Sequence, residues 1–287
     1  MHARGFLAGL SVGLLAALAL PATCAAQKKE KLTAEQVVER HLASIGAAPA
    51  RTAAKTRILE GQANFRMVTQ GVGQLAGPLY FASEGVKMRC AMRFGHPKYT
   101  VEEFAYNGEK IDVGQMEPGK RSPLENALLN YNELTREGLF GGSLSTAWTF
   151  LHWPGKEAKL SYDGTKKVDG RETYAIRYQP KRGSGTTQIT LYFDAETFRH
   201  VRTTYKITMP RSLGATPDAS PRVREPRFTI DETFTGHQAI EGLVLPTEWT
   251  VQYSYDGPEG SIIMEWKAWV ERVTTNDRID PKIFVLE

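Results

Sequence analysis

Cysteine is scarce in this 287-residue sequence, which contains only Cys24 and Cys90. If Cys24 leaves with the N-terminal segment described below, Cys90 has no partner, so we expect no disulfide within the chain. A lone cysteine is more often a small buried apolar side chain than a nucleophile. We therefore expect Cys90 to be buried in the core.

A strong excess of charge of one sign is also missing. The formal net charge is +4, and the basic residues do not gather in one segment. Nucleic-acid binding needs a concentrated basic patch, so we exclude nucleic acid as a partner.

Motifs of catalysis and metal binding are absent as well. The sequence has no HExxH, CxxC, GxSxG or GxxxxGK[ST] pattern, and its six histidines are scattered. Two pairs of neighbouring acids occur in predicted strands, Glu102 with Glu103 and Asp231 with Glu232. Strand neighbours face opposite sides, so the two members of a pair cannot act on one substrate, and we expect them on the wet face. The prediction is a protein that is not an enzyme and uses no cofactor or metal ion.

Beyond the N-terminus there is no long apolar run. Residues 6–20 are almost wholly apolar, Pro21 ends that run, and small residues follow up to Ala26. This layout is typical of a cleaved signal peptide over 1–26, and the run is short for a membrane span of about 20 residues. We expect a periplasmic protein that begins at Gln27. Two alternatives stay open, an uncleaved anchor and lipid attachment at Cys24.

The remaining pattern predicts strands with helices at two places. A capping box at Thr33 and Gln36 begins a helix that Gly46 and Pro49 end, with His41 as a partly buried structural residue. Alternating apolar and polar residues then predict strands over 57–68, 74–83, 86–94, 98–106, 109–116, 158–163, 171–179, 187–194, 199–209, 226–236, 243–255 and 260–273. Pro123 begins an amphipathic insertion at 123–155, with a second helical piece at 143–151, and 210–226 is a proline-rich flexible loop.

This order predicts a mainly β protein with some α-helix, formed by one domain over 27–287. A long antiparallel sheet of about ten or eleven strands should curl into a half-open β-barrel, with the N-terminal helix at one side and 123–155 as a helical lid. Its concave face is expected to be a hydrophobic ligand cavity, because so wide a surface is hard to fill with its own side chains. The predicted cavity walls are large aromatic and flexible apolar side chains, namely Met88, Met92, Phe94, Trp148, Tyr205, Trp249, Met264 and Trp266.

Several short segments, taken in order, resemble the outer-membrane lipoprotein carrier superfamily, which has the LolA/LolB-like fold. They are AEQVVERHLASIG at 34–46, EGQ at 60–62, YFDAET at 192–197 with VR at 201–202, GLVLPT at 242–247 and DPKIFV at 280–285. The resemblance spans the mature chain. It implies a half-open barrel whose cavity shields acyl chains in the periplasm, and no family motif fixes the residues that contact the ligand.

The first functional hypothesis is therefore a periplasmic carrier of lipid or lipoprotein acyl chains. A second is an envelope sensor of the same fold that binds lipid and signals to a membrane-anchored protein. An exported enzyme is the third and is disfavoured by the missing motifs. The cargo, the direction of transfer and the oligomeric state stay open.

Overall fold

A curved antiparallel sheet forms most of the computed structural model, which describes residues 32–69, 72–153, 156–209, 227–257 and 260–286. The predicted signal peptide at 1–26 and the predicted flexible loop at 210–226 lie outside the described residues. In spatial order the strands of the sheet are β5 (Ile111–Val113), β4 (Tyr99–Tyr106), β3 (Lys87–His96), β2 (Val72–Glu84), β1 (Thr56–Met67), β14 (Gly260–Thr275), β13 (Glu248–Gly257), β10 (Arg227–Thr235), β9 (His200–Thr208), β8 (Thr187–Asp194), β7 (Arg171–Gln179) and β6 (Lys159–Val168).

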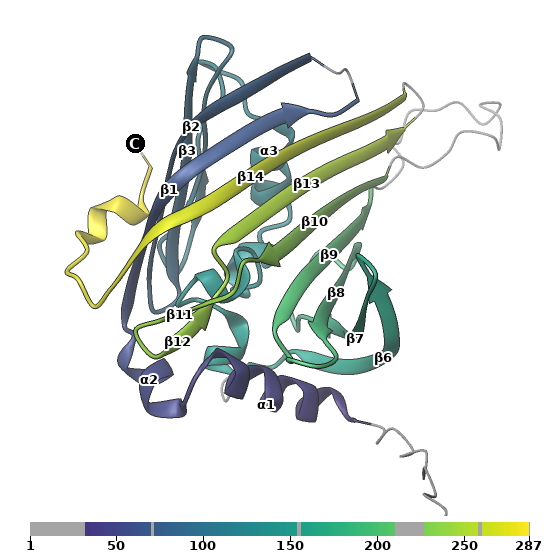
Figure 1. Cartoon of the computed structure of the whole chain (residues 1–287). Coiled ribbons are helices and arrows are strands. Elements are labelled where there is room, and N and C mark those ends of the chain that lie inside the picture. The colour runs from purple at the N-terminus through teal and green to yellow at the C-terminus, as the bar shows by residue number, and fades with distance from the viewer. Residues whose placement is uncertain (1–31, 70–71, 154–155, 210–226, 258–259, 287) are drawn as a thin grey trace, which may run out of the picture. The chain divides into compact units, whose positions relative to one another are not determined.

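The predicted fold class is confirmed, with a larger sheet than expected. Among the described residues twelve strands form the main sheet, and β11 (Gln238–Ile240) pairs with β12 (Leu243–Leu245) as a separate hairpin. Each neighbouring pair is antiparallel, and β5 and β6 are unpaired edges, so the sheet stays open. The chain enters the sheet at its middle with β1 and builds one side up to β5. It then continues at the far edge with β6 and returns to the middle with β14, which lies beside β1 (Figure 1).

The first helix, α1 (Ala34–Ile45), begins where the sequence predicts. The Gln36 amide donates to the Thr33 hydroxyl at 3.3 Å, and the Gln36 side chain accepts from the Thr33 amide at 2.8 Å. These two bonds satisfy free amides of the first turn. With the short helix α2 (Ala48–Ala53), α1 lies across one end of the curved sheet, beside β12 and β6 (Figure 1).

The insertion between β5 and β6 holds α3 (Pro123–Asn130), α4 (Glu133–Arg136) and two short 3-10 turns, η1 (Gly142–Leu144) and η2 (Thr149–His152). The single helical piece predicted over 143–151 is thus two separate turns. The chain has to bend sharply there, because Gly138 and Gly142 adopt left-handed φ values of 71° and 50°. A side chain at Gly138 would collide with the Ala147 carbonyl, so only glycine fits this close approach.

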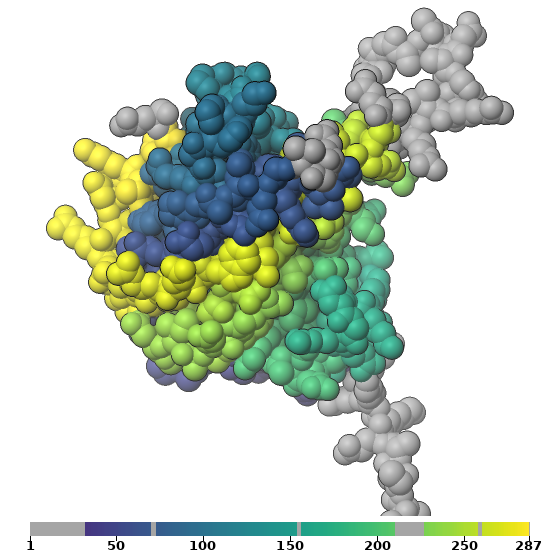
Figure 2. Space-filling model, turned by 45° about the horizontal axis from the view of Figure 1, so that its top comes forward, coloured from purple at the N-terminus to yellow at the C-terminus, as the bar shows by residue number. Residues whose placement is uncertain are grey.

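The two faces of the sheet differ. The strands β1, β14 and β13 lie side by side as adjoining bands on the surface seen in Figure 2. The last 3-10 turn, η3 (Pro281–Phe284), packs by β3 and β4, where Phe284 joins Ala82 and Ile279 in a small apolar cluster. Because Ala82 alternates with the inward-facing Phe81 and Ser83, this cluster covers the outer face. The main core lies on the opposite, concave face.

Candidate functional site

The concave face is covered by residues 123–153, called the lid from here on. Its large apolar side chains point onto the sheet and are almost fully buried, namely Leu124, Leu128, Leu134, Leu139, Phe140, Leu144, Trp148 and Phe150. Phe140 contacts both halves of the sheet, because its ring centre lies 5.3 Å from that of Phe104 on β4 and 5.6 Å from that of Trp249 on β13. The lid and the sheet therefore share one core.

A buried carboxyl group at the centre of the sheet binds the lid backbone. Glu232 is 0% exposed and accepts a hydrogen bond at 2.7 Å from the Gly141 amide of the lid. The Trp249 indole and the Tyr205 hydroxyl also donate to Glu232, at 2.9 and 2.7 Å. Burial raises the pKa of Glu232 to about 8, although these three donors act in the opposite direction. Desolvation dominates because no cation pairs with this carboxyl group within the described residues.

A buried guanidinium binds the next part of the lid. Arg57 on β1 donates to the backbone carbonyl oxygens of Ser143 and Leu144 at 2.8 and 2.9 Å. Its Nε atom has no hydrogen-bond partner among the residues that the structure describes. Burial lowers the pKa of Arg57 to about 10. Two carbonyl dipoles thus replace the water and the counter-ion that an arginine usually keeps.

Two buried histidines enclose the lid tryptophan. The Trp148 indole N–H donates to Nε2 of His41 at 2.9 Å, so this nitrogen carries no proton. Nδ1 of His41 lies 3.0 Å from the Phe198 carbonyl oxygen and carries the proton instead. Burial lowers the pKa of His41 to about 3. His200 stacks on Trp148 at 4.7 Å between ring centres, and burial also holds its pKa well below the usual value.

Each end of the lid is bound to one edge region of the sheet. At β4, Glu102 accepts hydrogen bonds from Ser122 at 2.8 Å and from Tyr99. Burial, followed by the nearby charge of Glu125, raises the pKa of Glu102 well above its ordinary value. Glu125 also closes the capping box that begins α3, since it accepts from the Ser122 amide at 2.7 Å.

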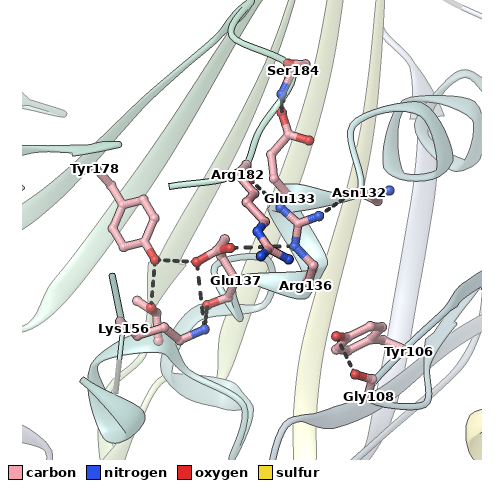
Figure 3. Close-up of polar contacts among 11 residues, drawn as sticks. Tyr106, Gly108, Asn132, Glu133, Arg136, Glu137, Lys156, Tyr178, Arg182 and Ser184 are labelled. Atoms are coloured by element: carbon pink, nitrogen blue, oxygen red, sulfur yellow. Dashed lines mark hydrogen bonds and ion pairs between the residues drawn. The ribbon is translucent and has the colours of Figure 1, made fainter. Parts of the chain in front are cut away.

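Figure 3 shows the opposite end, where α4 meets β7 and the loop that follows it. Glu133 accepts from the Ser184 and Thr187 hydroxyl groups, both at 2.9 Å. The Tyr178 hydroxyl donates to Glu137 at 2.8 Å, and the Lys156 ammonium lies 3.8 Å from the same carboxylate. The lid therefore ties the two separated regions of the open sheet to each other.

The structure brings the eight predicted cavity residues into this one core. Met88, Met92, Trp148, Tyr205, Trp249 and Trp266 are at most 1% exposed, Phe94 is 8% exposed, and Met264 packs against them while partly exposed. Their role as ligand walls stays a prediction. Neither the pocket beside Trp153 nor the pockets beside His237 are lined by any of the eight.

The prediction that the paired acids lie on the wet face is wrong for one member of each pair. Glu102 is 1% exposed and Glu232 is 0% exposed. The alternation within each strand contained the signal, because Glu232 shares its face with Ile230 and Phe234, and Glu102 shares its face with Phe104. Arg57 carried the same signal, because it shares its face of β1 with Leu59, Ala63 and Phe65, although a charged residue is normally exposed.

The described part of the chain has neither a membrane-crossing helix nor a metal cluster. Within residues 32–286, apart from the gaps, no helix combines the length and the apolar character that a bilayer crossing requires. In the same residues no group of three or more His, Cys, Asp or Glu side chains is placed to hold a metal ion. Cys90 is buried, as expected.

No known protein family and no curated protein matches this sequence. Solved structures do match it. A LolA superfamily protein from Nitrosomonas europaea is 12% identical, with 89% of this chain and 98% of that chain covered and a TM-score of 0.47. A DUF1329 family protein from Desulfovibrio piger is 11% identical, with 88% and 97% covered and a TM-score of 0.43. The lipoprotein LppX of Mycobacterium tuberculosis is 12% identical, with 84% and 96% covered and a TM-score of 0.23.

The superfamily named in the first of these matches is the one that the sequence resembles. At such identities and TM-scores, the matches give no ligand, partner or activity to this chain. What defines the protein is its own architecture, an open curved sheet whose apolar concave face is covered by a lid of the same chain.

Proposed function

We propose that this protein is an exported, periplasmic carrier that binds the acyl chain of a lipid or lipoprotein between the concave face and the lid, without catalysing a reaction. The sequence resemblance to lipoprotein carriers supports this function. The observation that carries it is an apolar surface that runs from a partly exposed rim at one end of the strands into the covered core.

This apolar rim consists of Met67, Leu75, Tyr255, Ile262 and Met264. Met264 pairs with Met67 on one side and with Tyr253 on the other, and shares the inward face with the buried Trp266. Ile262, one pair further out, is 36% exposed. An alkyl chain that contacts this rim can follow the inward-facing row towards Trp266 as the lid gives way.

The energetics of exchange favour such binding. A methylene group that leaves water gains about 0.8 kcal/mol, so ten of them supply about 8 kcal/mol. The alkyl chain also replaces the apolar contacts that the lid loses. The remaining cost is mainly in the polar contacts of the lid with Glu232, Arg57 and His41, each worth about 1–3 kcal/mol. Their sum is about 3–9 kcal/mol, which ten methylene groups roughly offset and which a chain of fourteen, worth about 11 kcal/mol, exceeds.

The experiment is native mass spectrometry of protein extracted gently from the cell envelope, followed by identification of any bound lipid. We expect a co-purified acyl lipid on the wild type. Met264→Glu places a charge on the apolar rim and should abolish co-purification of the lipid. Ile263→Glu is the matched control, because the neighbouring residue of β14 faces the outer side. The proposal is contradicted if the wild type carries no lipid, or if Met264→Glu and Ile263→Glu carry equal amounts of lipid. A stable complex with a membrane protein and no lipid favours the sensor instead.

A further inference from the structure

A pocket lies outside the covered concave face, between the helices α1 and α2 and the last turn of the lid. Its volume is about 500 Å³. Four large apolar side chains line it, Leu42 from α1 and Phe150, Leu151 and Trp153 from the lid. Phe150 is 1% exposed and forms the floor, whereas the other three are partly exposed walls. The volume is within the range of about 300–1,000 Å³ that is usual for small-molecule sites.

The polar part of this pocket is cationic. Arg51 and Lys55 line it, and none of its described lining residues is acidic. Arg51 is held in place, because its Nη1 donates to the carbonyl oxygens of Leu42, at 2.7 Å, and of Gly46. Lys55 is exposed, and within the described residues no ion pair engages its ammonium group. The pocket therefore combines apolar walls with the positive charge of Lys55, which is available to a ligand.

We propose that this pocket is a second ligand site, for a single-chain amphiphile that ends in a carboxylate, that is, a free fatty acid. The alkyl chain lies against Trp153 and Leu151 over the Phe150 floor. The carboxylate lies by Lys55, with Arg51 adding positive charge from behind. Charge and shape favour such a ligand over a neutral chain, which would leave Lys55 unused, and over a small anion, which would leave the apolar walls in water. The site does not rest on the proposed function, which concerns the other side of the lid.

The test compares palmitate with hexadecanol, which has the same chain and no charge. Binding is measured by calorimetry in the Met264→Glu background, so that the concave face does not contribute. We expect palmitate to bind at least fivefold more tightly than hexadecanol. Lys55→Gln should remove this preference and leave hexadecanol binding unchanged. Leu151→Glu should weaken both ligands at least tenfold.

Lys98→Gln, on the far turn between β3 and β4, is the charge control and should bind both ligands like the parent protein. The fold of each variant is checked by near-ultraviolet circular dichroism, and Lys55→Gln keeps the test valid if Leu151→Glu unfolds, since Lys55 is exposed. Equal affinities for palmitate and hexadecanol, or palmitate binding that Lys55→Gln leaves intact, overturn the inference. Palmitate binding that disappears in Met264→Glu alone also overturns it, while leaving the carrier function in place.

Discussion

Glu232 gives the most quantitative prediction, because it is a carboxyl group with no exposed surface that holds the lid through the Gly141 amide. Burial raises the pKa of Glu232 to about 8 in the folded protein, from an ordinary value of 4.5. Between pH 4.5 and 8 the folded protein keeps a proton that the unfolded chain releases. The free energy of unfolding must therefore fall as the pH rises through this window.

The size of the effect follows from the two pKa values. They differ by about 3.5, and each unit corresponds to about 1.4 kcal/mol, so the loss reaches about 5 kcal/mol near pH 8. Glu232→Gln removes the titration and keeps the shape, and its amide oxygen still accepts from Gly141 and Trp249. The variant should therefore gain stability relative to the wild type with rising pH.

Urea unfolding of both proteins at pH 5, 6, 7 and 8 measures this difference, and the difference cancels the titration of every other group. We expect the two unfolding free energies to diverge by about 1.4 kcal/mol per pH unit in favour of Glu232→Gln. Glu109→Gln removes an exposed acid and serves as the control, which should stay parallel to the wild type. If Glu232→Gln also stays parallel to the wild type, Glu232 is not a buried neutral acid and our reading of the lid contact is wrong.

Three further predictions concern the lid. Burial lowers the pKa of His41 to about 3, so the free energy of unfolding decreases as the pH falls from 6.5 towards 3. Between pH 7 and pH 5, urea unfolding should show the wild type losing about 2 kcal/mol more of this free energy than His41→Gln. Equal losses in the two proteins would mean that His41 is not a buried neutral histidine. Gly138→Ala should lower the stability measured by thermal unfolding by about 2–4 kcal/mol, because the new side chain would collide with the Ala147 carbonyl. Gly119→Ala is the control and should lower it by about 1 kcal/mol, since no atom lies within 4 Å of the added Cβ. Similar losses in the two variants would refute the close approach at Gly138. Arg57→Met should cost about 1–3 kcal/mol and speed hydrogen exchange of the lid amides at 141–149, and unchanged exchange shows that Arg57 does not hold the lid.

Local rules were sufficient for the alternation within most strands and for the start of α1. The strand predicted over 86–94 has Met88, Cys90, Met92 and Phe94 buried on one side, as its alternation required, whereas Val86, expected on that side too, is 43% exposed and precedes β3. The capping residue Thr33 began α1 as expected. Regular spacing is set by neighbours in the chain, so it is readable from sequence.

Boundaries that depend on distant contacts were predicted less well. The strand expected over 109–116 is only Ile111–Val113, and the one expected over 243–255 breaks at Pro246 into β12 and β13. The strand expected over 158–163 continues to Val168 as β6, and its pairing with β7 shifts register between Tyr162 and Thr165. Pro246 has no backbone N–H to donate to a neighbouring strand, which explains the break between β12 and β13. The shift in β6 depends on its partner strand.

The polar contacts of the lid were outside the reach of sequence reasoning. Trp148 and His41 are 107 residues apart, and Arg57 contacts backbone carbonyls 86 and 87 residues away. Such partners are fixed only once the insertion folds onto the sheet. The scattered positions of His41 and His200 gave no hint that both would enclose Trp148.

Photolabelling tests most directly whether an acyl chain binds between the lid and the concave face. A fatty acid with a diazirine near the middle of its chain is bound to the full-length protein and irradiated, and the labelled residues are located by peptide mass spectrometry. The carrier account predicts labels on the inward-facing side chains of β3 and β14, Met88, Met92, Met264 and Trp266, and fewer labels in Met264→Glu. Labels confined to the outer-face residues of these strands, such as Ile263, or none on either strand, would contradict it.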